Sequence, residues 1–204
     1  GPQIAYGFDW GFYWVYAFTV RVYYGDAVPH PGGEITWPAS GAAIGESPTL
    51  TVAARAGSSP IKQVDLLGYY EDFNWSGDGL FREWHCKRQY GALKHHIGTA
   101  TAAPFAVTWD TTWVPDQAEP IQLIARIADE GGVTTMTPVV ENLGFSRKGR
   151  SVRMYTSADV PEAFGVRVGR RKTCTLNLTG DLRKAKAARL VLSTWSAGRA
   201  DEIG

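Results

Sequence analysis

The sequence lacks the motifs that define several enzyme and metal-binding classes. It has no G-x-S-x-G nucleophile elbow, no H-E-x-x-H zinc motif, no phosphate-binding P-loop and no dinucleotide fingerprint. The only two cysteines, Cys86 and Cys174, stand too far apart for a CxxC redox or zinc motif, although a disulfide between them is possible. No run of about 18 apolar residues occurs, so we expect no membrane insertion.

Glycine and aromatic residues are plentiful where methionine and cysteine are scarce. The 204 residues include 23 Gly and 8 Trp but only 2 Met, and aromatic residues make up 12% of the chain. Such a composition is typical of β-rich, turn-rich proteins, in which aromatic side chains fill the core or line ligand surfaces. The start at Gly1-Pro2 and the stop at Asp201-Glu202-Ile203-Gly204 suggest a piece of a longer protein.

The net charge of +1 hides an uneven distribution along the chain. Residues 1–146 carry 8 Lys and Arg against 15 Asp and Glu, whereas residues 147–204 carry 13 against 5. This asymmetry indicates two modules with surfaces of opposite charge. The basic clusters Arg147-Lys148-Gly149-Arg150 and Arg170-Arg171-Lys172 lack the aromatic residues and motifs of a nucleic-acid reader. An anionic polysaccharide, or an acidic neighbouring module, would suit them better than nucleic acid.

Three regions differ in their hydrophobic pattern. Residues 1–33 form an aromatic β segment and a linker, because aromatic side chains occupy alternate positions from Tyr6 to Tyr24. This aromatic face is either a packed core or an open platform for sugar rings. Residues 34–146 contain short alternating runs separated by turns, which predicts an antiparallel β-sandwich. The expected strands are Ile35–Trp37, Thr49–Ala54, Val64–Tyr70, Phe105–Trp109, Ile121–Ala128 and Val133–Val140.

Residues 34–146 resemble the immunoglobulin-like modules of secreted or cell-surface bacterial proteins that act on polysaccharides. The motifs that carry the resemblance are Trp37-Pro38-Ala39-Ser40-Gly41, Ala103-Pro104-Phe105-Ala106-Val107-Thr108-Trp109-Asp110, and the strand that ends in Asp129-Glu130-Gly131-Gly132. The resemblance implies an all-β, immunoglobulin-like sandwich that serves as a spacer or a binding module. The sequence departs from that pattern by a long insertion from Glu71 to Ile97.

The insertion contains a twelve-residue stretch, Asp72 to Glu83, with the spacing of a calcium loop. Calcium loops place oxygen ligands at alternate positions and a carboxylate at the twelfth, with Gly at the sixth. Here Gly77 is the sixth residue. The candidate ligands are Asp72, Asn74, Ser76, Asp78 and Glu83. Both flanks read as strands, however, so the alternative is a hairpin tip that needs no metal. Pairing of His85, His95 or His96 around zinc is disfavoured, because adjacent strand residues point to opposite faces.

Aromatic residues cluster in and beside the same insertion. Five are candidates for stacking on sugar rings: Tyr70, Phe73, Trp75, Trp84 and Trp113. Loops are normally polar and exposed, so an aromatic loop of this density suggests either ligand binding or a small satellite core. Glu71 and Glu83 could in principle form a carboxylate pair for glycoside cleavage.

The hydrophobic pattern of residues 147–204 predicts a partial second β-sandwich module. Expected strands are Val152–Tyr155, Thr173–Leu178 and Leu190–Trp195, with one helical turn in Asp181–Ala188. The run around Leu190–Trp195 resembles the start of a carbohydrate-binding jelly roll.

The leading hypothesis is a non-catalytic carbohydrate-binding or spacer module of a secreted or cell-surface bacterial protein, with calcium as its expected cofactor. Two alternatives remain open. The chain could belong to a carbohydrate-active enzyme, a glycoside hydrolase or polysaccharide lyase, and shape its active site. It could also be a purely structural or adhesive assembly protein.

Overall fold

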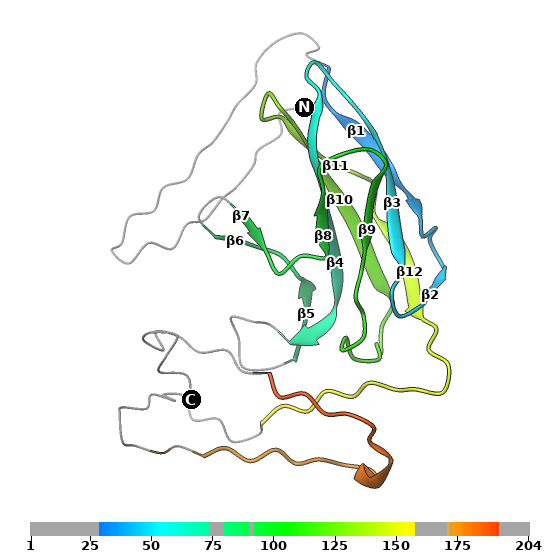
Figure 1. The fold of residues 1–204 in the computed structure, drawn as a ribbon, viewed down its shortest axis with the longest axis vertical. Helices are drawn as coiled ribbons and strands as arrows, with labels where there is room; N and C mark the ends of the chain where they lie inside the picture. Colours follow the sequence, from blue (N-terminus) through cyan, green and yellow to red (C-terminus); the bar gives the residue numbers. More distant parts are fainter. Residues whose placement is uncertain (1–28, 74–79, 90–91, 158–170, 172, 192–204) are drawn as a thin grey trace.

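The computed structural model describes residues 29–73, 80–89, 92–157, 171 and 173–191. Two β-sheets pack against each other and form an immunoglobulin-like antiparallel sandwich (Figure 1). The smaller sheet has the order β1-β3-β9 and the larger the order β2-β12-β10-β4-β5. All of these pairings are antiparallel except that of β2 with β12. The fold class expected from the sequence is therefore confirmed.

The strands of the smaller sheet are β1 (Gly32–Trp37), β3 (Thr49–Arg55) and β9 (Phe105–Thr108). The larger sheet comprises β2 (Ala43–Ile44), β4 (Ile61–Phe73), β5 (Leu80–Trp84), β10 (Ile121–Asp129) and β12 (Val140–Phe145). Two short strands extend it: β8 (Gly98–Ala100) pairs with β4, and β11 (Thr134–Met136) pairs with β10. A separate hairpin consists of β6 (Lys87–Gln89) and β7 (Ala92–Lys94).

The core lies between the two sheets because alternate residues of each strand face inward. Strand β10 shows this most clearly, since every second residue from Ile121 to Asp129 is buried. Side chains from the smaller sheet meet those from the larger sheet in one cluster. Its fully buried members include Ile44, Leu50, Leu66, Ile121, Leu123, Ile127 and Leu143.

The strand expected at Val133–Val140 is wrong in its middle part. The structure divides it into β11 and β12, with Thr137, Pro138 and Val139 between them. Pro138 has no N–H to give to a sheet ladder. Thr137 instead exchanges hydrogen bonds with Ala125 of β10, through its backbone N–H (2.9 Å) and its hydroxyl oxygen (3.0 Å). The chain can therefore change direction while this backbone stays paired.

The insertion begins as an extension of the sandwich. Strand β4 runs to Phe73, and β5 returns beside it with Phe73 opposite Leu80 and Tyr70 opposite Glu83. Strands flank the calcium-type spacing on both sides, as expected, but the second flank, expected as one strand over Trp84–Tyr90, is interrupted between the end of β5 at Trp84 and the start of β6 at Lys87. The aromatic β segment of residues 1–28 and the loop residues 74–79 lie outside the described residues.

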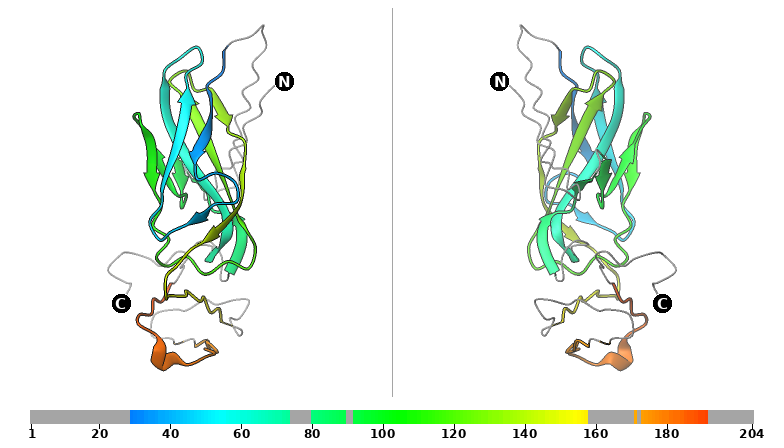
Figure 2. Two further views of the ribbon diagram at one scale, coloured as in Figure 1. Left: turned by 90° about the vertical axis from the view of Figure 1, so that its right-hand side faces the viewer. Right: turned by 90° about the vertical axis from the view of Figure 1, so that its left-hand side faces the viewer.

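The described residues after β12, 146–157 and 173–191, lie beyond one end of the sandwich, as both views in Figure 2 show. The expectation of strands at Val152–Tyr155 and Thr173–Leu178 is wrong, because these residues form no strand in the structure. A short 3₁₀ turn, η1 (Leu182–Lys184), occurs where the helical turn was expected, and the Asp181 carboxylate caps it by accepting the Arg183 N–H. The division of the chain at residues 33 and 146 stays a prediction.

No helix in the described part of the chain is both long and apolar enough to span a membrane.

Candidate functional site

A cleft opens at the end of the sandwich where the insertion leaves it, and we call it the end cleft. It has a volume of about 490 Å³ and is formed by the ends of β4 and β5, the 85–87 and 95–97 segments, and the 108–114 loop. Its aromatic lining consists of Tyr70, Phe73, Trp84 and Trp109. Its polar lining includes Asp72, Glu83, His85, Lys87, His95, His96, Thr108 and Asp110. A cleft of this size and mixed character is typical of a small-ligand site.

Tyr70 forms part of the floor of the end cleft and is buried. Its ring packs against His85 (4.2 Å between centroids) and Trp109 (5.0 Å). Gly68 makes this placement possible, because a Cβ atom at Gly68 would lie 2.7 Å from the Tyr70 ring. His85 is fixed in turn by a 2.8 Å hydrogen bond between its Nε2 and the Tyr70 carbonyl. Tyr70 therefore supports the site from below and offers no free ring face.

The other stacking candidates take different positions. Phe73 and Trp84 are half-buried and line the end cleft, and the Trp84 ring also packs on Tyr69 at 5.5 Å. Trp113 is 39% exposed and projects from the loop beside the end cleft, next to the lining residue Val114. Trp75 lies outside the described residues. Phe73 and Trp84 thus line the cleft, while the register places them at positions alternate to Asp72 and Glu83, on the face of the hairpin that also carries Tyr69.

Two of the five expected calcium ligands can be placed. Asp72 lies on β4 and Glu83 on β5, in register positions that put both on the same face of the hairpin, and both line the end cleft. Asn74, Ser76 and Asp78 lie outside the described residues. Among the residues that the structure does describe, no three His, Cys, Asp or Glu side chains gather as a metal site. Calcium binding therefore stays a prediction, with two carboxylates that fit it.

The register separates the carboxylates of Glu71 and Glu83. Glu83 lies opposite Tyr70, so Glu71, the next residue, points to the other face of the same hairpin. Glu83 lines the end cleft, whereas Glu71 lines a second cavity beside Asp116 and Tyr155. The pairing of Glu71 with Glu83 for glycoside cleavage is therefore wrong, because the two side chains cannot meet at one bond.

Asp72, Asp110, His95 and His96 of the end cleft have shifted pKa values. Burial raises the pKa of Asp72, although the Phe73 N–H (2.8 Å) and the nearby His85 and Arg189 favour its charged form. Hydrogen bonds from Thr112 lower the pKa of Asp110. Burial is also the main cause that lowers the pKa values of His95 and His96. The cleft thus combines carboxylates with imidazoles that favour the neutral form.

Sequence reasoning missed the contribution of His85, Trp109 and Asp110 to this cleft. Trp109 and Asp110 stood out only as part of the sandwich motif, and the histidines only as weak metal candidates. Their convergence depends on the position of the 108–114 loop against β4, which adjacent sequence does not specify. Cys86, which also lines the cleft, and the exposed Cys174 are both free thiols, so the possible disulfide is not formed.

The basic cluster that begins at Arg147 has an internal role. Arg147 has a side chain that is only 3% exposed and makes an ion pair with Asp116 at 2.5 Å. Arg150 pairs with Glu46 at 3.3 Å. The Arg147 guanidinium is therefore held within the protein, whereas Arg150 is exposed and its ion pair with Glu46 lies at the surface.

The fold and the cleft define the chain as an immunoglobulin-like β-sandwich module with an elaborated end. Among solved structures, it is similar to the fibronectin(III)-like modules of CbhA from Clostridium thermocellum, with 18% identity and a TM-score of 0.38. That match covers 60% of this chain and 50% of the other, so the chain spans about half the length of the structure it matches. No family model and no curated protein matches the sequence.

Proposed function

We propose that the chain is a non-catalytic carbohydrate-binding module of a secreted or cell-surface protein, and that the end cleft holds a segment of a polysaccharide. The observation that supports this proposal is the mixed lining of the cleft, where the aromatic residues Phe73, Trp84 and Trp109 occur together with acidic, imidazole and hydroxyl-bearing residues. Sugars have apolar ring faces and hydroxyl edges, and amphipathic aromatic residues beside polar groups suit both. The resemblance of residues 34–146 to modules of polysaccharide-acting proteins agrees with this role.

The charge of the cleft favours a neutral glycan over an anionic one. The carboxylates of Asp72, Glu83 and Asp110 line the cleft, against one lysine, Lys87. Like charges brought together in a cleft repel, and this discriminates against uronic-acid polymers. Arg147 and Arg150 also form ion pairs within the protein, with Asp116 and Glu46, and these pairs offset positive charge that could otherwise favour an anionic glycan.

A direct binding measurement tests this proposal. We expect at least one of cellohexaose, xylohexaose and chitohexaose to bind in isothermal titration calorimetry, while hexagalacturonate binds more weakly. Trp84→Ala should weaken the binding about tenfold, which corresponds to about 1.4 kcal/mol, through loss of one stacking surface. Trp37→Ala is the matched control, because Trp37 is 41% exposed and lies on β1, outside the cleft. If none of the four sugars binds the folded wild-type protein, the proposal fails.

We also propose that calcium stabilises the insertion. Hard divalent cations prefer carboxylate oxygens, and Asp72 and Glu83 supply two of them from paired strands. A ligand that binds only the folded state adds about 2.7 kcal/mol of stability at a concentration one hundred times its dissociation constant. The melting temperature should therefore be higher in calcium than in chelator. The difference should disappear in the Asp72→Asn/Glu83→Gln double variant, and identical melts of the wild-type protein would refute the proposal.

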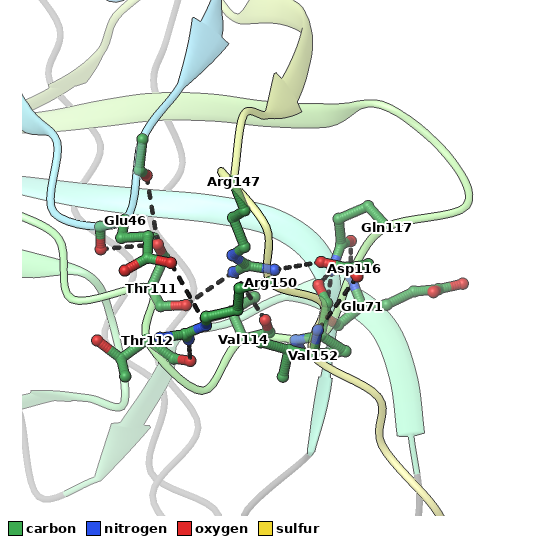
Figure 3. Close-up of polar contacts among 12 residues, drawn as sticks. Glu46, Glu71, Thr111, Thr112, Val114, Asp116, Gln117, Arg147, Arg150 and Val152 are labelled. Carbon is green, nitrogen blue, oxygen red and sulfur yellow. Dashed lines mark hydrogen bonds and ion pairs between the residues drawn. The ribbon is translucent and has the colours of Figure 1, made fainter. Parts of the chain in front are cut away.

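A spacer role has separate support in the contacts that join the sandwich to the following chain. Arg147, Arg150 and Val152 all bind groups of the sandwich, so the connection is held by specific contacts (Figure 3). A module fixed to the next segment in this way would transmit orientation along a longer protein.

A further inference from the structure

Arg147 is a buried cation at the point where the chain leaves the sandwich. Its guanidinium donates to the Asp116 carboxylate (2.5 Å) and to the carbonyl oxygens of Thr111 (2.8 Å) and Val114 (2.9 Å). It also lies over the Phe145 ring, 4.2 Å from the centroid. These three acceptors belong to one loop, as Figure 3 shows. A buried charge is tolerated only when it is paired and hydrogen-bonded, so the loop and Arg147 depend on each other.

The residues that follow Arg147 bind the same loop. Arg150 donates to the carbonyl of Thr112. Val152 and Asp116 form a reciprocal pair, in which the Asp116 N–H donates to the Val152 carbonyl (2.9 Å) and the Val152 N–H donates to the Asp116 carboxylate (3.1 Å). Residues 147–152 thus follow the loop closely, and we call them the clasp.

The loop held by the clasp is one wall of the end cleft. Val114 lines the cleft with its side chain while its carbonyl is bound by Arg147. Asp110, another lining residue, directly precedes Thr111, which is fully buried and bonded to the Glu46 carbonyl through its N–H (3.0 Å) and its hydroxyl (2.8 Å). The clasp therefore fixes the backbone that carries two lining residues.

The same loop also reaches the opposite wall. Gln117, next to Asp116, accepts the Glu71 N–H with its amide oxygen (2.7 Å) and donates to the Glu71 carbonyl (2.9 Å). Glu71 lies on β4 between Tyr70 and Asp72, both of which line the cleft. Arg147 is thus connected to both walls, by its hydrogen bond to Asp116 and by those of the next residue, Gln117, to Glu71.

We propose that the clasp sets the shape of the end cleft and that Arg147 is the positioning residue of the glycan site. This proposal rests on the proposed function for its glycan part only. Surface loops without such contacts open easily, and a site that must order itself on binding loses affinity. Arg147 holds the 110–117 loop in place before a ligand arrives. The entropy loss of ordering this loop therefore does not weaken binding. The binding module therefore extends beyond residue 146, through the clasp.

Hydrogen exchange of the full chain tests the positioning role without any ligand. In Arg147→Gln, the amides of Thr111, Val114, Asp116 and Glu71 should exchange at least tenfold faster than in the wild-type protein. The amides in the centres of β4 and β10 should keep their rates. Lys148→Gln is the matched control, because it removes the neighbouring, exposed positive charge. Equal loop exchange in Arg147→Gln and Lys148→Gln would overturn the proposal.

A second variant guards against global unfolding. If Arg147→Gln does not fold, Asp116→Asn removes only the charged partner of Arg147 and should give the same pattern of faster loop exchange. Unchanged loop exchange in a folded Asp116→Asn protein would likewise count against the clasp.

Binding of the hexasaccharides tests the link to the site. For any of cellohexaose, xylohexaose or chitohexaose that binds the wild-type protein, Arg147→Gln should raise the dissociation constant about tenfold. Saturating sugar should slow the loop exchange of this variant again, because coupling between two sites is reciprocal. A purely structural role would lower the melting temperature and leave the affinity of the folded fraction unchanged. If no sugar binds the wild-type protein, the proposed function fails while the exchange experiment still decides the clasp.

Discussion

Asp65→Ala is expected to lower the free energy of unfolding by about 3 kcal/mol, the low end of the range for breaking a buried ion pair. Asp65 lies on β4 and is completely buried. Its carboxylate accepts hydrogen bonds from Arg126 of β10 (2.8 and 2.9 Å) and from the Thr99 hydroxyl of β8 (2.6 Å). Alanine would leave the guanidinium of Arg126, whose side chain is only 16% exposed, without its counter-charge.

A second arginine makes this loss more severe. The pKa of Arg88 is lowered by burial and by the positive charge of Arg126, whereas Asp65 raises it. Removing Asp65 would therefore leave the cations of Arg126 and Arg88 near each other without the carboxylate that offsets them. The effect is measured by urea denaturation of the variant and the wild-type protein at neutral pH.

A double variant separates the value of the ion pair from the cost of breaking it. Replacing both partners, as in Asp65→Leu/Arg126→Met, should recover most of the stability that Asp65→Ala loses, because the guanidinium of Arg126 is removed together with its counter-charge. If Asp65→Ala unfolds at the same urea concentration as the wild-type protein, the pair contributes nothing and the interpretation of Asp65 as a buried anchor is wrong.

Strands with regular alternation were predictable because burial in a sandwich repeats every second residue. The pattern from Ile121 to Ala128 predicted β10 almost to its ends, and the pattern from Val64 to Tyr70 predicted the centre of β4. The same pattern predicted a strand at Thr173–Leu178 that the structure does not contain. Leu176 and Leu178 are exposed there, and a strand also needs a neighbour to pair with, which alternation alone cannot supply.

The role of the arginines was not predictable from the sequence for a related reason. A cluster such as Arg147-Lys148-Gly149-Arg150 usually lies on a solvated surface. Only the folded structure shows which of its side chains are buried and which are exposed. Arg147 is buried because three acceptors from Thr111, Val114 and Asp116 converge on it, while Lys148 stays exposed. The acceptors stand about 30 residues earlier in the chain, so no local pattern indicates the contact.

The candidate site was partly predictable. The aromatic density of the insertion correctly indicated an unusual region, and Phe73 and Trp84 do line a cleft. Tyr70 could not be distinguished from them by residue type, yet its ring belongs to the buried cluster below the cleft. What separates the three is the face of the β4–β5 hairpin, because Tyr70 lies on the face where Trp109 and His85 pack, and Phe73 and Trp84 occupy the alternate positions.

Trp109→Ala is expected to lower the free energy of unfolding by about 3–5 kcal/mol, the range for deleting a large buried aromatic side chain. Trp109 is 4% exposed and follows the last residue of β9. Its ring packs on Tyr70 (5.0 Å) and on Phe145 (5.9 Å), so it joins the floor of the end cleft to the start of the clasp. Alanine would leave a void between the rings of Tyr70 and Phe145, and the transition in urea should move to a much lower concentration.

The matched control is Trp113→Ala, four residues further along the same loop. Trp113 is 39% exposed, and surface substitutions usually change stability by less than about 0.5 kcal/mol. The two variants remove the same side chain from one segment of chain, so a difference in their stability reports burial and not loss of tryptophan as such. Equal denaturation midpoints would show that Trp109 is not part of the core. A large loss of stability in Trp109→Ala but not in Trp113→Ala would establish that the end cleft is built on the hydrophobic core. The same aromatic rings would then support both the cleft and the stability of the fold.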